Sequence, residues 1–128
     1  MKVTITERGW PAHYVCAPRC LFRRNTLVKY GEQRVVVSTV GGYILNAELA
    51  QIAHNRYYET MAFKAEKNGE YWDADTHEQF DFTSPWAITG ESVADLSPGV
   101  DNEANEMHEA VVKEIADKLE TGALANEV

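Results

Sequence analysis

The sequence has few cysteines and no long apolar segment. Cys16 and Cys20 are the only cysteines among 128 residues, and no apolar run approaches the roughly 18 residues that a membrane-spanning helix needs. Residues 1–6 (MKVTIT) lack the continuous apolar stretch of a secretory signal. These absences predict a cytoplasmic protein with no membrane partner, in which both thiols are reduced.

Motifs for common chemistries are also missing. Gly41 and Gly42 follow a strand-like run but lack the Lys-Ser/Thr that completes a phosphate-binding loop. His13, Cys16 and Cys20 would supply three zinc ligands, yet zinc motifs usually repeat the cysteine pair, and this chain has no second pair. The sequence therefore predicts no catalytic residue, no metal and no cofactor, and it favours a protein that is not an enzyme.

Positive charge is scarce in the second half of the chain. Residues 70–128 contain two lysines and fifteen acidic residues, whereas residues 1–34 contain seven basic and two acidic residues, and the whole chain has a net charge of −8. This asymmetry predicts a dipolar surface. It makes nucleic acid an improbable partner and favours docking on a basic surface of another protein.

The pattern of apolar residues predicts one α+β domain over residues 1–128. Strand-like runs occur at residues 2–6, 21–30, 34–40 and 79–83, and a hairpin is expected at residues 56–76. A short helix is expected at residues 46–53, with Asn46 as its cap. We expect an antiparallel sheet of four to six strands with a long carboxyl-terminal helix packed on one face.

The expected hairpin turns at Asn68-Gly69, because both residues accept the positive φ of a type I′ turn. If these two residues form the loop, Lys64 lies opposite Asp73 on a polar face, and Phe63 lies opposite Ala74 on an apolar face. Asp73, Asp75 and His77 would then share one face. They would suit a divalent metal ion, but the opposed lysine favours solvated charges.

The clearest predicted element is a helix at about residues 102–121. Its apolar residues recur at three- and four-residue steps and form one stripe: Ala104, Met107, Val111, Val112, Ile115, Ala116 and Leu119. His108 is expected at the edge of this stripe, where its ring packs and still reaches water. Gly122 is expected to end the helix, and residues 122–128 to form a flexible tail.

Two charged residues are predicted on apolar strand faces. Arg24 alternates with Phe22 and Val28, and Glu59 alternates with Met61 and Phe63. Because an unpaired buried charge is costly, each residue needs a partner or a route to water. The favoured interpretation is a partly buried ion pair, which Arg24 and Glu59 could form with each other, or a strand end at which the charge reaches water. The alternative is a small enzyme or ligand-binding protein with a pocket around Arg24 and Glu59.

Several segments resemble a family of short, uncharacterised proteins of bacteriophages and prophages. They are residues 19–27 (RCLFRRNTL), 36–41 (VVSTVG), 56–63 (RYYETMAF), 72–74 (WDA), 84–86 (SPW) and 107–112 (MHEAVV). The resemblance implies a small accessory protein of a mobile element, located in the host cytoplasm. By analogy, it would act by binding and blocking a host protein, including defence machinery.

The leading hypothesis is a small, acidic, non-enzymatic binding protein that inhibits a host nucleic-acid-binding or defence protein. The carboxylates expected to meet its basic surface are Asp73, Asp75, Glu78, Asp81, Glu103, Glu106, Glu109, Asp117 and Glu120. A single helix covers one face of a sheet. A homodimer is therefore expected to cover the other face, unless Trp10, Trp86 or Tyr58 does so.

Overall fold

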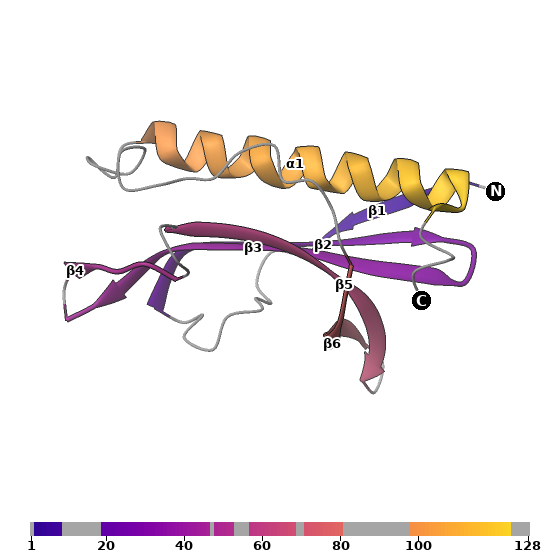
Figure 1. Ribbon diagram of the computed structural model, residues 1–128, viewed down its shortest axis with the longest axis horizontal. Helices are drawn as coiled ribbons and strands as arrows, with labels where there is room; N and C mark the ends of the chain where they lie inside the picture. Colours follow the sequence, from indigo (N-terminus) through magenta and orange to yellow (C-terminus); the bar gives the residue numbers. More distant parts are fainter. Residues whose placement is uncertain are drawn as a thin grey trace.

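The computed structural model describes residues 2–8, 19–46, 48–52, 57–68, 71–80 and 98–123. It confirms the predicted α+β class, with an antiparallel sheet in the order β1-β2-β3-β5-β6 and one helix lying across a face of it (Figure 1). A further short strand, β4, pairs with β3 outside this order. The elements are β1 (Thr4–Glu7), β2 (Cys20–Tyr30), β3 (Gln33–Leu45), β4 (Glu48–Leu49), β5 (Tyr58–Asn68), β6 (Tyr71–Phe80) and α1 (Pro98–Thr121).

Strands β2 and β3 form a long hairpin at the centre of the sheet. It closes where Tyr30 pairs with Gln33, and Gly31 adopts the positive φ of 62° that the turn needs. Val35, Val36 and Val37 are all buried. A strand that is apolar on both faces belongs inside a sheet, and β3 indeed lies between β2 and β5.

Strand β3 continues five residues beyond its predicted end at Val40. Gly41 permits this because the ring of Tyr58 occupies the space that a Cβ at Gly41 would need. The chain then turns at Asn46, which has a φ of 52°, and β4 pairs back onto Ile44 and Leu45. The predicted helix at residues 46–53 is therefore wrong over its described part, because Asn46 is a turn residue here instead of a cap.

The β5–β6 hairpin has a different register from the one predicted. Asn68 pairs with Tyr71 and Ala65 with Ala74, so Asp73 lies opposite Glu66 instead of Lys64. A further irregularity separates Ala65 from Phe63, beyond which β5 pairs with the end of β6. Extra residues in one strand bend the pair.

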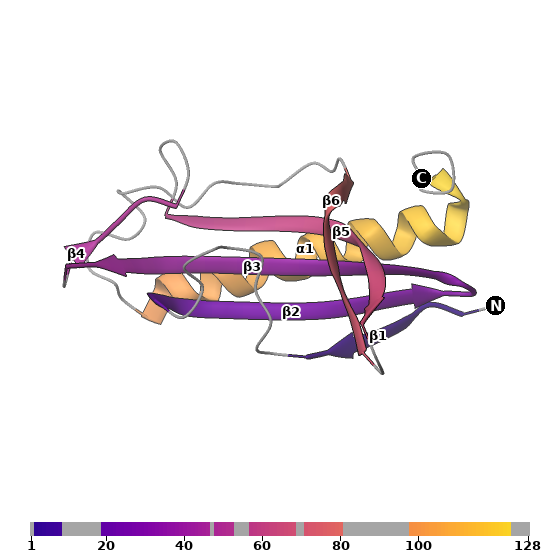
Figure 2. The ribbon, with the colours of Figure 1, turned by 90° about the horizontal axis from the view of Figure 1, so that it is seen from below.

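Bending carries β5 away from the helix and takes β6 across the opposite face of the sheet (Figure 2). There β6 also contacts β3. Gln79 and Phe80 belong to the end of β6 and pair with Phe63 and Ala62, so they do not start a separate strand. The other residues predicted for that strand, 81–83, lie outside the described residues.

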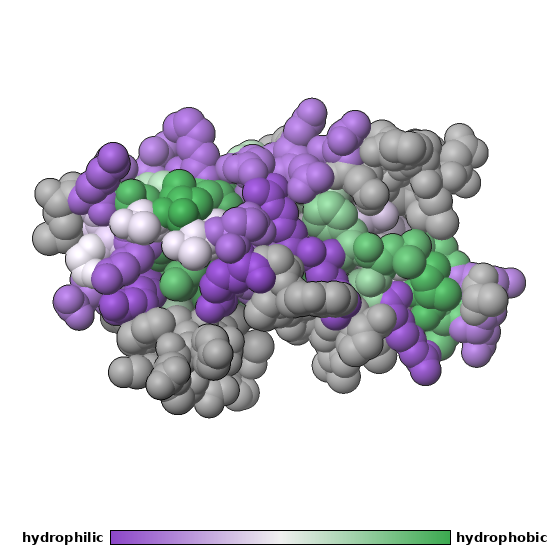
Figure 3. Space-filling view, turned by 180° about the vertical axis from the view of Figure 1, so that it is seen from behind, coloured by the Kyte–Doolittle hydropathy of each residue, from purple (hydrophilic) through white to green (hydrophobic). Residues whose placement is uncertain are grey.

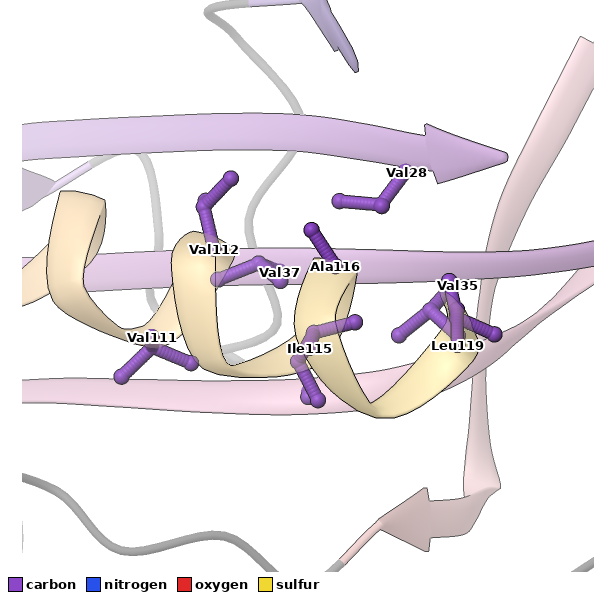
Figure 4. Packing of buried hydrophobic residues seen from close by; sticks show 9 residues of the cluster. Val28, Val35, Val37, Val111, Val112, Ile115, Ala116 and Leu119 are labelled. Carbon is purple, nitrogen blue, oxygen red and sulfur yellow. The ribbon is translucent and has the colours of Figure 1, made fainter. Parts of the chain in front are cut away.

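Helix α1 packs its predicted apolar stripe on β2, β3 and β5. It begins four residues before the predicted start and ends at Gly122, whose φ is 79° and whose amide donates to the Leu119 carbonyl. Burying one aliphatic side chain of this stripe stabilises the fold by about 1.5–3 kcal/mol. Figure 4 shows the main cluster, formed by Val28, Val35, Val37, Ala62, Val111, Val112, Ile115, Ala116 and Leu119.

The face of the sheet opposite the helix is also buried at its centre. Val36, Ser38 and Val40 are fully buried although they alternate with the residues that face α1. Tyr58, expected to cover this second face, packs instead against Ala104 and Met107 of the helix. The centre of the second face is therefore not bare. Trp10 and Trp86 lie outside the described residues.

Candidate functional site

A polar cluster lies between α1 and the sheet, centred on His108. This side chain is fully buried, whereas the sequence predicted that it would reach water at the edge of the apolar stripe. Its Nε2 lies 2.7 Å from the Thr26 hydroxyl, and its Nδ1 lies 2.7 Å from the Thr39 hydroxyl. Both ring nitrogens are thus hydrogen-bonded to strands β2 and β3, which satisfies the imidazole in an otherwise apolar layer.

The cluster extends from His108 toward both sides of the sheet. On one side, the Thr39 hydroxyl lies 2.6 Å from the Thr60 hydroxyl of β5. On the other side, the Thr26 hydroxyl donates to the Glu7 carboxylate of β1 over 2.8 Å. The network therefore links the helix to four strands that are distant in sequence.

Arg24 joins the outer end of this network. Its Nε donates to Glu7 over 3.0 Å, its Nη1 donates to Asn105 over 3.2 Å, and its Nη2 contacts the Glu109 carboxylate. Arg24 is partly exposed, so these ion pairs are screened by water. They bind the amino-terminal half of α1 to the edge of the sheet.

The charged end of the network determines the direction of its hydrogen bonds. Ionised Glu7 can only accept, so Thr26 donates to it and accepts from the Nε2–H of His108. A neutral imidazole protonated at Nε2 has an acceptor at Nδ1, which requires Thr39 to donate. Thr39 in turn accepts from Thr60. Every hydrogen bond in this network is therefore donated in the direction of Glu7.

The pKa values agree with this arrangement of protons. Burial, together with the nearby positive charge of Arg24, lowers the pKa of His108 to about 4, although the Glu7 charge opposes the shift. Burial acts to raise the pKa of Glu7, but hydrogen bonds from Arg24 and Thr26 outweigh it, and the net shift is downward. His108 is therefore neutral and Glu7 ionised at neutral pH.

This cluster is better suited to stability than to catalysis. No solvent reaches His108, and both of its nitrogens already bond to protein hydroxyls. A general base or a metal ligand needs a nitrogen that a substrate or an ion can approach. Among the described residues, no group of three or more His, Cys, Asp or Glu side chains could hold a metal ion.

Arg24 and Glu59 do not form the predicted pair. Arg24 faces the helix, where it binds Asn105 and Glu109. Glu59 stands between Tyr58 and Thr60, which both face the helix side, so alternation places Glu59 on the opposite face of the sheet. The two side chains therefore line no common pocket.

The predicted acidic binding residues fall into two groups. Glu106, Glu109, Asp117 and Glu120 are exposed on α1, and Glu103 is half-buried there. Hydrophilic side chains follow the helix at the top of Figure 3. Asp117 bonds to Lys113 over 2.8 Å, while Glu109 bonds to Arg24.

The second acidic group lies on β6, across the sheet from α1 (Figure 1). Asp73, Asp75 and Glu78 are part of this strand, and Asp81 lies outside the described residues. The described members of this set therefore belong to two elements on opposite sides of the sheet. The carboxylates of α1 make up their own surface.

Sequence reasoning did not identify His108 and Glu7 as members of one network. A signal was present, because Thr26 shares the alternating strand face of Arg24 and Val28, and a hydroxyl on such a face needs a buried partner. The partner comes from a helix 82 residues further along the chain, and alternation alone does not show which helical residue it is.

No family model, no curated protein and no solved structure matches this chain. Among the described residues, no helix combines the length and apolar character needed to cross a membrane. The resemblance to phage and prophage proteins therefore remains a prediction.

Proposed function

We propose that this protein binds, without catalysis, a basic surface of another protein through the outward face of α1. The observation that carries the proposal is the division of this helix into two faces. One face is an apolar stripe buried on the sheet, and the other exposes carboxylates to solvent. The helix contains seven acidic and two basic residues.

The carboxylates differ in how available they are to a partner. Glu109 is engaged by Arg24, and Asp117 by Lys113. Glu106 and Glu120 are exposed, and among the described residues neither has an ion-pair partner within 4 Å. Glu103 lies one helical turn before Glu106 and adds charge at the same end. The amino-terminal half of α1 is therefore the favoured contact region.

A basic partner fits this surface because complementary charge steers two proteins together and selects against acidic surfaces. Many basic protein surfaces bind nucleic acid through its phosphates. A row of carboxylates on a rigid helix would compete with those phosphates. The resemblance to phage proteins makes a host nucleic-acid-binding or defence protein the partner that we propose.

The test is capture from a bacterial lysate on the immobilised protein, at about 0.05 M and about 0.5 M salt, because salt screens exposed charges. Wild-type protein is compared with the double variant Glu103→Lys/Glu106→Lys. The matched control is Glu32→Lys/Glu48→Lys, which changes the net charge equally at two exposed glutamates of the sheet layer. Captured proteins are identified by mass spectrometry and assayed for nucleic-acid binding.

The proposal predicts that a captured protein is lost at high salt and lost with the helix variant, but is retained by the control. Adding wild-type protein should also displace nucleic acid from that partner. If the helix variant captured the same proteins as wild type, the outward face of α1 would not be the binding surface. If both variants lost the partner equally, only the net charge would matter, and the proposal would fail.

A further inference from the structure

Strand β1 lies at one end of the strand order and is exposed along its whole length. All four of its residues are exposed, and the side chain of Ile5 is 55% accessible to solvent. Figure 3 views the molecule from behind and shows apolar atoms surrounded by hydrophilic ones toward this edge. An open strand edge is a template for pairing with another strand.

The backbone groups that face outward can be assigned from one hydrogen bond. The Arg8 amide donates to the Asn25 carbonyl over 2.8 Å, in the same register that pairs Thr4 with Lys29 and Thr6 with Leu27. Hydrogen-bonded pairs alternate along an antiparallel ladder. Thr4 and Thr6 therefore bond inward to β2, and the amides and carbonyls of Ile5 and Glu7 point away from the sheet. By the same alternation, the amide and carbonyl of Val3 also point away from the sheet.

We propose that β1 pairs antiparallel with β1 of a second copy of this chain, about a two-fold axis at Ile5. In this register Ile5 pairs with its own copy, and Val3 pairs with Glu7. The backbone amides and carbonyls of all three residues point outward, so each outward amide of one copy meets an outward carbonyl of the other. The edge is thus complementary to itself, as a two-fold interface requires.

The side chains next to the two-fold axis agree with this register, whereas the like charges of Lys2 and Arg8 at its two ends oppose it and weaken the contact. Ile5 lies opposite Val28, whose side chain packs under the helix, so both Ile5 side chains meet on the helix side of the joined sheet. On the other side, Thr4 lies opposite Thr6 of the second copy. Lys2 lies opposite Arg8, whose Nε is bonded back to the Asn25 side chain of its own chain over 2.9 Å.

The size of the contact predicts a weak dimer. Pairing of one short strand buries less than the roughly 1,200 Å² of a stable complex, so assembly should depend on protein concentration. The contact consists of backbone hydrogen bonds and apolar burial. It should therefore persist in salt that would disrupt the acidic surface of α1, and it is independent of the proposed function.

The test is sedimentation equilibrium of the full chain from about 10 μM to about 1 mM, the range in which a contact of this size should assemble. The proposal predicts a shift from the 14.4 kDa monomer toward twice that mass. Ile5→Lys places two charges on the axis and should raise the dimer Kd at least tenfold. Ile5→Pro removes one outward donor and no donor to β2, and should have a similar effect.

Leu21→Lys is the matched control, because Leu21 is also an exposed apolar residue of the sheet, 66% accessible, and lies outside the β1 pairing. Its dimer Kd should stay within about twofold, and circular dichroism should show that all three variants fold.

A monomer throughout would overturn the proposal. Loss of the dimer in Leu21→Lys but not Ile5→Lys would place the contact elsewhere, and loss in Ile5→Lys but not Ile5→Pro would exclude backbone pairing. If the wild-type protein stays monomeric and the Ile5 amide becomes protected from hydrogen exchange only when another protein is added, the partner of β1 is a strand of that other protein and not a second copy.

Discussion

At the scale of single residues, His108 is predicted to be the polar side chain whose loss costs the most stability. His108→Leu fills the site with an apolar group but removes the hydrogen bonds to Thr26 and Thr39. Leaving buried hydroxyls short of a partner costs about 1–3 kcal/mol each. We expect the free energy of unfolding to fall by about 2–4 kcal/mol in urea titrations.

His108→Gln is the control, because its amide can replace one ring nitrogen as a hydrogen-bonding group. It should recover part of the loss. If His108→Leu were as stable as wild type, the threonine contacts would contribute nothing net, and the network would be incidental to the docking of the helix.

The same residue predicts how stability depends on pH. The pKa of His108 falls from 6.5 to about 4 on folding, so between these values the unfolded chain binds the additional proton. The stabilisation is complete above about pH 6.5 and decreases as the pH falls toward about 4. Linkage gives about 1.4 kcal/mol for each pH unit, or about 3 kcal/mol over this window.

Urea titrations of wild type and His108→Gln from pH 7 to pH 4 test this prediction. The difference between the two proteins should shrink as the pH falls, because glutamine does not titrate. Glu7, whose pKa is lowered by its bonds to Arg24 and Thr26, loses its contribution only below about pH 4.5 and is present in both proteins. A constant difference would show that His108 titrates normally.

Single residues also show where sequence reasoning reaches its limit. The apolar positions of α1 were predictable, because their spacing alone defines a face. His108 stands directly beside Met107 in that pattern, and its ring nitrogens are satisfied by hydroxyls from two strands. Contacts between residues so far apart in sequence leave no periodic signal, so the centre of the network could be found only in three dimensions.

At the scale of elements, the approach of β3 and β5 depends on Gly41. A Cβ at this position would overlap the ring of Tyr58, which is buried against Ala104 and Met107. Gly41→Ala must displace either the ring or the strand, and overpacking of this kind costs about 1–3 kcal/mol. Chemical denaturation should show a loss of this size.

A double-mutant cycle with Tyr58→Ala provides the control for this prediction. Removing the ring makes room for the added methyl group, so Gly41→Ala should cost much less in the Tyr58→Ala background. Equal costs in both backgrounds would mean that the glycine is needed for its backbone and not for the approach of Tyr58.

The elements differ in how well the sequence predicts them. The helix follows from its one periodic apolar face, and the β2–β3 hairpin follows from two strand-like runs separated by a turn at Gly31. The β5–β6 hairpin does not, because Asn-Gly predicts a turn without fixing which pair closes it. Ala65 pairs with Ala74, while Phe63 pairs with Gln79. That offset bends the strands, and no local pattern in the sequence specifies it.

At the scale of the whole molecule, this bend explains why one copy can bury both faces of β3. Helix α1 covers one face, and β6 crosses the other (Figure 2). The bare second face that predicted a homodimer is therefore absent at Val36 and Val40. The centre of this face is therefore not available for self-association, and the exposed edge at β1 is the surface that the backbone geometry favours.

The same architecture predicts a gradient of stability from β3 to β1, which native-state hydrogen exchange can measure. Each interior amide of β3 donates to β2 or β5, and residues 35–43 are buried. These amides should exchange only through global unfolding. Thr4 and Thr6 bond to β2 from an exposed edge and should exchange through local opening, at least 100-fold faster.

Low denaturant should accelerate exchange in β3 and hardly affect β1, because only global unfolding exposes much surface. Spectra recorded at about 50 μM and about 1 mM, on either side of weak association, separate fraying from dimer formation. Equal protection of β1 and β3 at the lower concentration would mean that the edge strand unfolds with the core.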